Sequence, residues 1–329
     1  MKGLIQESYG PPKKVVKLVE MPEPTPDKDG VVVEVEAAPV HLADLKFING
    51  EEGFRWFDMP RYPGHEGIGI VVAKGSTVTQ FDVGDRVFLP LACGSYRQRV
   101  AVPASPCIPA PAGDAQQLCL TSLNGMTAYI LLEDFCPSEP GSWVVQNGAN
   151  SSCGRYLISM AKAKGIRTVN IVRRNELIDE LKDIGADIVL VDSGDPDHMA
   201  AQVKAATGEA KMSVGIDCVA STATATIARC LAQNGTVVSY GFMTGENCQI
   251  AFQDLFNKGI RLVGMNMHTN RSEAEYRKVH TQLAQWIAKG TMSATIAAAY
   301  NLSQSQDAFA HELKTGTERM GKIVILPNG

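Results

Sequence analysis

The chain has 329 residues, of which 45% are hydrophobic and 20% charged, and its 35 acidic and 31 basic side chains give a net charge of -4. This length suits two domains of roughly 100–200 residues each. The charge balance gives no electrostatic reason to expect a nucleic acid partner. No apolar run approaches the ~18–20 residues that cross a bilayer. We therefore expect a soluble globular protein with no nucleic acid and no membrane as partner.

The opening stretch MKGLIQESYG has neither an apolar signal region nor an Arg-rich amphipathic leader, so we expect a cytoplasmic protein. The eight cysteines include no CxxC pair. Disulfide frameworks belong to small secreted chains, and a structural zinc needs closely spaced cysteines that converge on one ion. Free, mostly buried thiols are the expectation.

The chain changes character near residue 118. Before it, short β-rich runs such as VVVEVEAA, IGIVVAKG and DRVFLPL alternate with Pro and Gly, a pattern typical of an antiparallel, barrel-like β domain. After it, the runs SWVVQN, TVNIVR, DIVLVD, SVGIDCV and TVVSYG alternate with amphipathic helical stretches, which predicts a doubly wound parallel sheet. The end, GKIVILPNG, returns to strand character. The predicted fold class is α/β plus all-β, with domains at 1–118 rejoined by 298–329, and at 119–297.

A dinucleotide-binding turn is predicted between the first strand and helix of the second domain. The strand SWVVQN is followed by the small-residue turn NGANSSCG and the helix RYLISMAKAKG. Such a turn lets a pyrophosphate approach the backbone at a helix N-terminus. The glycine fingerprint is degenerate, because only its last glycine is present. The six fingerprint positions are Ala149, Asn150, Ser151, Ser152, Cys153 and Gly154.

The end of the next strand distinguishes the two nicotinamide cofactors. An NAD site places a carboxylate there to bind the ribose 2′-hydroxyl. This chain has Arg173, Arg174 and Asn175 instead, beginning 19 residues beyond Gly154. Two guanidinium groups suit a 2′-phosphate, and a helix start is otherwise a poor place for cations. The sequence therefore predicts NADPH.

The whole chain resembles the medium-chain dehydrogenase/reductase superfamily, and within it the mitochondrial-type 2-enoyl thioester reductases. The stretches that carry the resemblance are AAPVHLADLKFINGEEG, PGHEGIG, FDVGDRV, NGMTAYILLEDF, VVQNGANSSCGRYLISMAKAKGIRTVNIVRRN and GTVVSYGFM. The resemblance implies a GroES-like catalytic domain, a Rossmann domain, a cleft between them, and a homodimer formed through the Rossmann sheets. It further implies cofactor contacts at Asn124, Thr127, Tyr240, Gly241, Phe242, Met243, Met265, Asn266, Met267, His268 and Lys322.

The superfamily's catalytic zinc uses three protein ligands and a water. By resemblance the first two positions are His41 and His65, and the third falls near Thr121 or Ser122, neither of which supplies a good ligand. The lobe that holds a structural zinc is absent. We therefore expect no metal, and interpret His65 as a hydrogen-bonded residue flanking the cleft.

Without a metal, the chemistry best suited to this scaffold is hydride delivery to an activated carbon–carbon double bond, which needs positioning, an oxyanion contact and a proton donor. The enoyl thioester reductases carry a tyrosine in a QGNYG-like segment, where this chain reads NGEEG with Glu52 at the tyrosine position. A carboxylate donates a proton only if its pKa is raised. Tyr62 and His41 are the other candidate donors, so the donor stays unassigned among these three residues and water.

Two alternatives stay open at this point. One is an NADPH-dependent quinone or enone reductase on the same scaffold, which needs no thioester contacts. The other is a cofactor-binding protein without turnover, which the absence of the family tyrosine allows.

Overall fold

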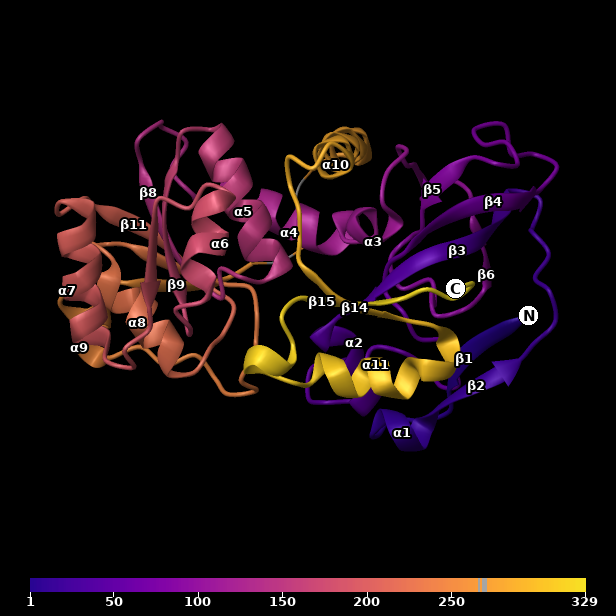
Figure 1. Cartoon of the computed structure of the whole chain (residues 1–329), viewed down its shortest axis with the longest axis horizontal. Coiled ribbons are helices and arrows are strands. Elements are labelled where there is room, and N and C mark those ends of the chain that lie inside the picture. Colours follow the sequence, from indigo (N-terminus) through magenta and orange to yellow (C-terminus); the bar gives the residue numbers. More distant parts are fainter. Residues whose placement is uncertain (266, 268–270) are drawn as a thin grey trace. The chain divides into compact units, whose positions relative to one another are not determined.

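The computed structural model describes residues 1–265, 267 and 271–329. The chain folds into two compact units, which we treat separately. The first unit comprises Met1–Leu123 and Ser272–Gly329, and the second comprises Asn124–Arg271. The colours of Figure 1 trace this order, from the indigo and purple strands of the first unit through the second unit to the yellow C-terminal elements.

The first unit is built on a largely antiparallel sheet. Its strands are β1 (Lys2–Gln6), β2 (Val16–Glu20), β3 (Gly30–Val40), β4 (Ile68–Lys74), β5 (Arg86–Phe88), β6 (Arg99–Pro103), β7 (Ile108–Pro109), β14 (Ile296–Tyr300) and β15 (Lys322–Ile325). Its helices are α1 (Pro12–Val15), α2 (Leu42–Asn49), α3 (Ala115–Leu118), α10 (Glu273–Ala288) and α11 (Ser305–Glu312), with 3-10 turns at Leu302–Gln304 and Gly316–Glu318. The sheet order is β14-β15-β3-β4-β5-β7, with β6 also paired to β3, while β1 and β2 form a separate hairpin.

The central strand β3 explains why this unit folds around its sheet. Val31, Val33 and Val35 alternate along it and are fully buried, so one face of the strand contributes to the core. β-branched side chains fit such a pleated, half-buried surface. Further along, β3 pairs antiparallel with β15 in the register Ile323↔Val40. The C-terminal strand thus rejoins the first unit.

The second unit is a doubly wound parallel sheet. Its strands are β8 (Trp143–Asn147), β9 (Arg167–Val172), β10 (Ile188–Val191), β11 (Met212–Asp217), β12 (Thr236–Ser239) and β13 (Arg261–Gly264). Its helices are α4 (Met126–Ile130), α5 (Ser152–Ala163), α6 (Leu177–Asp183), α7 (Pro196–Thr207), α8 (Thr222–Cys230) and α9 (Phe252–Phe256), and a π-helical turn covers Leu131–Phe135. Another π-helical turn, Thr121–Gly125, begins in the first unit and ends in the second. No helix in the described ranges is long and apolar enough to cross a membrane.

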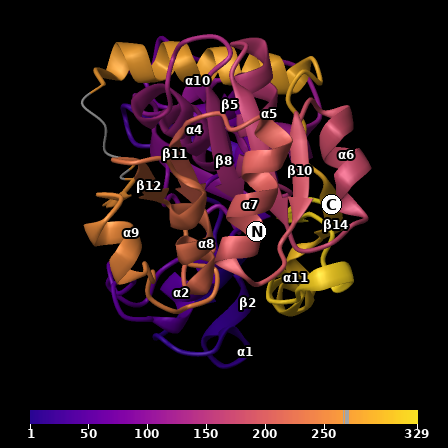
Figure 2. The ribbon, with the colours of Figure 1, turned by 90° about the vertical axis from the view of Figure 1, so that its left-hand side faces the viewer.

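The strand order of the second unit, β10-β9-β8-β11-β12-β13, reverses direction between β8 and β11. Helices α5 and α6 lie on one face of the sheet, and α7 and α8 pack together on the other, which faces the viewer in Figure 2. Ligands of doubly wound sheets bind beyond the carboxyl ends of the strands at such a switch point. The ends of β8 and β11 are therefore where a cofactor site is expected.

The division of the chain differs from the predicted boundary at residue 298. Helix α10 begins at Glu273 and contacts α3 and β7, so it groups with the first unit rather than with the parallel sheet. Its buried face carries His280, Leu283 and Ile287. Helical periodicity indicates that such a face must be covered, but it does not say which unit covers it. The boundary at residue 298 itself falls inside β14.

Candidate functional site

The switch point of the second unit is tied together by two polar side chains at the strand ends. The Asn147 amide donates to Oδ1 of Asp217 over 2.7 Å, and its own Oδ1 accepts from the backbone N–H of Cys218 over 2.9 Å. Thr224 donates to the other Asp217 oxygen over 2.6 Å. These residues were not among the predicted site residues. Their position at the carboxyl ends of two central strands is the signal that could have identified them.

The turn after β8 has the shape that a phosphate group requires. Gly148 has φ +57°, which L side chains rarely adopt, and a Cβ there would lie 2.2 Å from the sulfur of Cys218, so a side chain would strain the turn and force Cys218 to shift. Ser151 caps α5 by accepting from the N–H of Gly154 over 3.1 Å. The other N–H groups of the first turn have no acceptor within the helix, and they lie at its positive dipole end. This turn, which covers all six fingerprint positions, can therefore hold a pyrophosphate.

The last fingerprint glycine brings helix and strand together. A Cβ on Gly154 would lie 2.7 Å from the backbone oxygen of Ala149, closer than real Cβ contacts allow. The neighbouring residues Cys153 and Ala149 are buried, while Asn150, Ser151 and Ser152 are half-buried. Only glycine fits at the position where α5 approaches the turn this closely.

Two of the three residues that follow β9 carry a positive charge. Arg173 and Asn175 are exposed, and Arg174 is half-buried. The Nη1 atom of Arg174 is buried and has no hydrogen-bond partner among the described residues. A buried donor without a partner is costly, and an anionic ligand would satisfy it. This orphan nitrogen fits the predicted 2′-phosphate.

The segment after β12 crosses the end of β11. Tyr240 donates its backbone N–H to the backbone oxygen of Asp217 over 3.0 Å. A Cβ on Gly241 would lie 2.4 Å from the backbone oxygen of Cys218, so the two backbones are in close approach. Burial, together with the neighbouring thiols of Cys153 and Cys218, raises the pKa of Tyr240 well above its usual value. This phenol therefore stays protonated at neutral pH.

The remaining predicted cofactor residues of the second unit lie in several places. Phe242 and Met243 are exposed, and Met265 donates its backbone N–H to Ser239 over 2.9 Å. The Thr127 hydroxyl contacts the sulfur of Met267 over 3.3 Å. The side-chain oxygen of Asn124 is buried and has no partner among the described residues. Asn266 and His268 lie outside the described residues.

In the first unit, strand register brings three distant segments together. Strands β3 and β4 pair antiparallel in the register Ala37↔Ile68, which places residues 38–41 beside residues 64–67. The register Ile323↔Val40 then places Lys322 opposite His41. His41 directly follows β3 and is the N-cap of α2, where its backbone N–H donates to the carboxylate of Asp44 over 2.9 Å.

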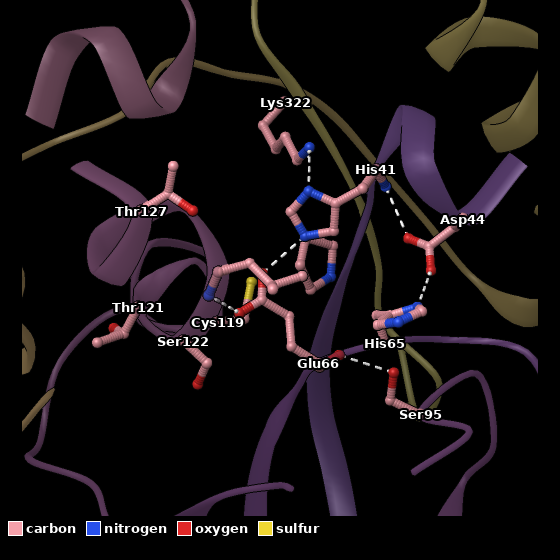
Figure 3. Close-up of polar contacts among 12 residues, drawn as sticks. His41, Asp44, His65, Glu66, Ser95, Cys119, Thr121, Ser122, Thr127 and Lys322 are labelled. Atoms are coloured by element: carbon pink, nitrogen blue, oxygen red, sulfur yellow. Dashed lines mark hydrogen bonds and ion pairs between the residues drawn. The ribbon is translucent and has the colours of Figure 1, made fainter. Parts of the chain in front are cut away.

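These segments form a continuous chain of hydrogen bonds, shown in Figure 3. The Nε2 atom of His41 lies 2.6 Å from Oε1 of Glu66, and its Nδ1 atom lies 2.8 Å from Nζ of Lys322. The second oxygen of Glu66 accepts the backbone N–H of Leu123 over 2.8 Å. Glu66 is fully buried, His41 is buried and Lys322 is half-buried. The chain therefore connects a buried carboxylate to a partly accessible ammonium through one imidazole.

A second cluster beside it is centred on Asp44. Its carboxylate accepts from the Tyr96 hydroxyl over 3.0 Å, from the His41 backbone N–H over 2.9 Å, and lies 3.2 Å from Nδ1 of His65. Burial opposes ionisation, but the hydrogen bond and charge of His65 outweigh it, and the pKa of Asp44 is lowered to about 2. The ring of His65 stacks on Phe47 with centroids 4.7 Å apart. His65 is hydrogen-bonded, as the sequence predicts.

The other two candidate donors have different surroundings. Glu52 is exposed in the turn after α2. Tyr62 is 41% exposed, and its ring lies under the guanidinium of Arg97 at 4.2 Å. In the described part of the chain no hydrogen bond or ion pair joins Glu52, Tyr62 and His41 to one another. The structure thus gives the three candidates separate environments, with a polar network around His41.

The residues at the family's zinc positions do not fit a zinc ion. Both ring nitrogens of His41 are engaged by Glu66 and Lys322, and a Lys ammonium is a repulsive neighbour for a cation. At the third position, Ser122 binds His280 over 2.9 Å and Thr121 donates to a backbone oxygen over 2.7 Å. Within residues 1–265, 267 and 271–329, no group of three His, Cys, Asp or Glu side chains could hold a metal. Zinc independence stays a prediction for solution measurement.

Two family models match the chain. Residues 27–112 match the alcohol dehydrogenase GroES-like domain, and residues 153–289 match the zinc-binding dehydrogenase domain. The enoyl-[acyl-carrier-protein] reductase of Xenopus tropicalis mitochondria is 32% identical over 281 residues, covering 80% of this chain and 76% of the relative. The rat mitochondrial enzyme is 29% identical over 327 residues, covering 95% and 86%.

Solved structures share the fold over the full length. A mycobacterial protein in complex with NADPH is 26% identical, with TM-score 0.86 and coverage of 99% of this chain and 100% of that chain. A mycobacterial quinone oxidoreductase is also 26% identical, with TM-score 0.84 and the same coverage. A mutant form of the enoyl thioester reductase from Candida tropicalis is 22% identical, with TM-score 0.84 and coverage of 99% of each chain, and this likeness supports the fold alone. The chain therefore belongs to the medium-chain dehydrogenase/reductase superfamily, on its enoyl reductase-like branch.

Proposed function

We propose that the protein is an NADPH-dependent oxidoreductase that reduces the activated double bond of a trans-2-enoyl thioester. The observation that carries the cofactor assignment is the Nη1 atom of Arg174, two residues after β9, which is buried and has no hydrogen-bond partner among the described residues. The reaction class is supported by the enoyl reductase relatives, which the chain matches over most of their length.

The residues of the second unit suit each part of the cofactor. The turn from Gly148 to Gly154 and the N-terminus of α5 receive the pyrophosphate, since the turn excludes side chains and offers N–H donors. Arg173 and Arg174 receive the 2′-phosphate. When bound, NADPH supplies a hydride to the β-carbon of the enoyl group.

The decisive experiment compares acceptors at a fixed NADPH concentration. Crotonyl-CoA should cause oxidation of NADPH, measured by loss of absorbance at the nicotinamide band, and NADH should be a much poorer donor. A reaction without acceptor is the control for uncoupled oxidation. Failure of every enoyl thioester tested, across several chain lengths, would contradict the proposal.

The quinone or enone reductase alternative is favoured by one specific finding, the match to a mycobacterial quinone oxidoreductase. A simple quinone is therefore included in the same assay. Turnover with the quinone but not with crotonyl-CoA would support this alternative. Binding of NADPH with no turnover on either acceptor would favour the cofactor-binding protein without activity.

A homodimer is part of the proposal. Strand β13 is the edge of the parallel sheet, and Leu262 on it is 42% exposed. On α9, which precedes this strand, Phe252 and Phe256 are 70% and 75% exposed and their rings stack. An exposed edge strand with apolar neighbours is a surface that pairs with another chain. Light scattering should give twice the chain mass of 35.4 kDa, and Leu262→Arg should shift it toward the monomer.

The cytoplasmic location is likewise a proposal. Several relatives carry the word mitochondrial in their names, so imaging or fractionation of the tagged full chain in its own cell is the appropriate test. Co-fractionation with an organelle would contradict a cytoplasmic location.

A further inference from the structure

The hydrogen-bonded chain Glu66–His41–Lys322 has a charge arrangement suited to catalysis. At its closed end, the fully buried Glu66 carboxylate accepts two hydrogen bonds, from His41 and from the Leu123 backbone. At its open end, the Lys322 ammonium is half-buried and has no ion pair with a carboxylate in the part of the chain that the structure describes. The negative charge is therefore buried and compensated, while the positive charge lies at the accessible end.

The bonding pattern assigns the protons of His41. An ammonium has only donors, so Lys322 donates to Nδ1, and this nitrogen must be the unprotonated one. The Nε2–H group then donates to the Glu66 carboxylate over 2.6 Å. A carboxylate that accepts from one ring nitrogen fixes the tautomer and makes the other nitrogen a better acceptor. His41 and Glu66 thereby hold the lysine nitrogen in one place.

We propose that the Lys322 ammonium, held by His41 and Glu66, binds the enolate oxygen of the substrate and supplies the proton that completes the reduction. This inference rests on the proposed enoyl reductase function. It gives Lys322 the role of proton donor. In the family a tyrosine has this role, and Glu52 stands at that position in this chain. Lys322 is the catalytic residue in this scheme, and His41 and Glu66 are positioning residues.

Other groups of the first unit are less suited to the task. The Tyr62 ring is 41% exposed and lies under Arg97, and Glu52 is an exposed carboxylate. Lys46 is neutralised by Glu51 at 2.7 Å. An oxyanion is stabilised most by a fixed, partly desolvated positive donor whose charge is not already cancelled by a carboxylate.

In the proposed reaction, bound NADPH would be oxidised to NADP⁺ as a C–H bond of its nicotinamide ring breaks and a C–H bond forms at the β-carbon. The π-electrons of the double bond would move through the α-carbon to the thioester oxygen. Two N–H donors of Lys322 remain for this oxygen, since the third is used by His41. Protonation then forms a C–H bond at the α-carbon and breaks one N–H bond of Lys322. The neutral amine regains its proton from water at its accessible side.

The test compares Lys322→Met with wild type and with the matched control Lys74→Met. Lys74 is in the same unit, its side chain is 32% exposed, and its nitrogen pairs with Asp82 at 2.7 Å. With crotonyl-CoA as the probe, Lys322→Met should lower kcat by about 10²–10³-fold, the usual cost of removing an oxyanion donor or a general acid. Its Kd for NADPH, from fluorescence titration, should stay within about threefold of wild type. The control should keep wild-type kcat.

Isotope effects separate a proton donor from a residue that merely supports the fold. In Lys322→Met, protonation becomes slow, so the solvent deuterium effect on kcat should rise while the effect of deuterated NADPH falls. A cationic small amine added to Lys322→Ala should restore part of the rate. Full activity of Lys322→Met would overturn the proposal. A decrease in rate explained entirely by weaker NADPH binding would also overturn it, and would return Lys322 to the role of a cofactor-binding residue.

Two further measurements decide the matter if the lysine variants fail to fold. His41→Ala retains Lys322 but removes its acceptor, and it should lower kcat by about tenfold with a raised solvent isotope effect. In the wild-type protein without ligand, ¹⁵N NMR should find His41 protonated at Nε2 only. Protonation at Nδ1 alone would contradict the proposed bonding pattern. This NMR result does not depend on turnover, so it distinguishes failure of this inference from failure of the enoyl reductase function.

Discussion

Lowering the pH from 7 to 5 is expected to destabilise the first unit through one buried imidazole, His280. Its Nε2 lies 2.9 Å from the Ser122 hydroxyl, and its Nδ1 is buried without a partner among the described residues. The edge of its ring contacts Phe88, with centroids 4.6 Å apart. Burial, and then the charge of Arg277, lowers the pKa of His280 from 6.5 to about 4. The folded state therefore keeps this ring neutral where the unfolded state binds a proton.

The sign and size of the effect follow from this difference. The stabilisation is fully present above the unfolded pKa of 6.5 and is lost as the pH falls toward the folded pKa of about 4. A difference of this size corresponds to roughly 3 kcal/mol in total, of which about 2 kcal/mol is lost between pH 7 and pH 5. Comparison with a variant that lacks this imidazole isolates the histidine contribution from that of the other titratable groups.

The assay is urea denaturation at several pH values for wild type and His280→Gln. The free energy of unfolding of the wild type should fall by about 2 kcal/mol more than that of the variant between pH 7 and pH 5. His198→Gln, at an exposed histidine on α7, is the control and should keep the wild-type pH dependence. Equal pH dependence in wild type and His280→Gln, or an NMR titration of the His280 ring near pH 6.5, would refute the reasoning.

Three other outcomes are expected. Elemental analysis should find well under one zinc per chain and activity should survive EDTA, because His41 and His65 lack a third ligand; stoichiometric, tightly bound zinc would contradict this. Replacing both Arg173 and Arg174 with Ala should weaken NADPH binding far more than NADH binding, by about 1.5–3 kcal/mol for each charge-assisted hydrogen bond removed. Equal affinity of the wild type for NADPH and NADH would contradict the assignment of these arginines to the 2′-phosphate. Gly148→Ala should weaken dinucleotide binding measured by calorimetry, since its Cβ would lie 2.2 Å from a buried sulfur, and unchanged affinity would show that the turn adapts.

The parallel sheet could be predicted from sequence because its signal is local. Strand β8 is buried along its whole length, β9 is buried at all but its first residue, and both contain β-branched side chains. Small-residue turns and amphipathic helices separate these runs, and strict alternation of this kind has one common architectural solution. The phosphate-binding turn could be predicted for the same reason, since Gly154 and the start of α5 are adjacent in sequence.

Parts of the site could not be predicted because they depend on strand register. His41 and Lys322 are 281 positions apart, and Asn147 and Asp217 are 70 apart. A shift of one residue in the pairing of β15 with β3 would turn Lys322 to the other face of the sheet. Composition and periodicity do not determine this register, so the sequence indicated His41 and Lys322 as separate candidates without joining them.

The pairing of β15 with β3 also sets an order for folding during synthesis. The second unit is one continuous segment, Asn124–Arg271, whereas the first unit needs residues on both sides of it. The last three residues of β3, Ala38–Val40, pair with Ile323–Ile325, which leave the ribosome after the whole parallel sheet has been made. Domains generally fold as units while the chain grows. The nucleotide-binding sheet can therefore form first. The ammonium of Lys322 reaches His41 only after β15 has paired with β3 in the first unit.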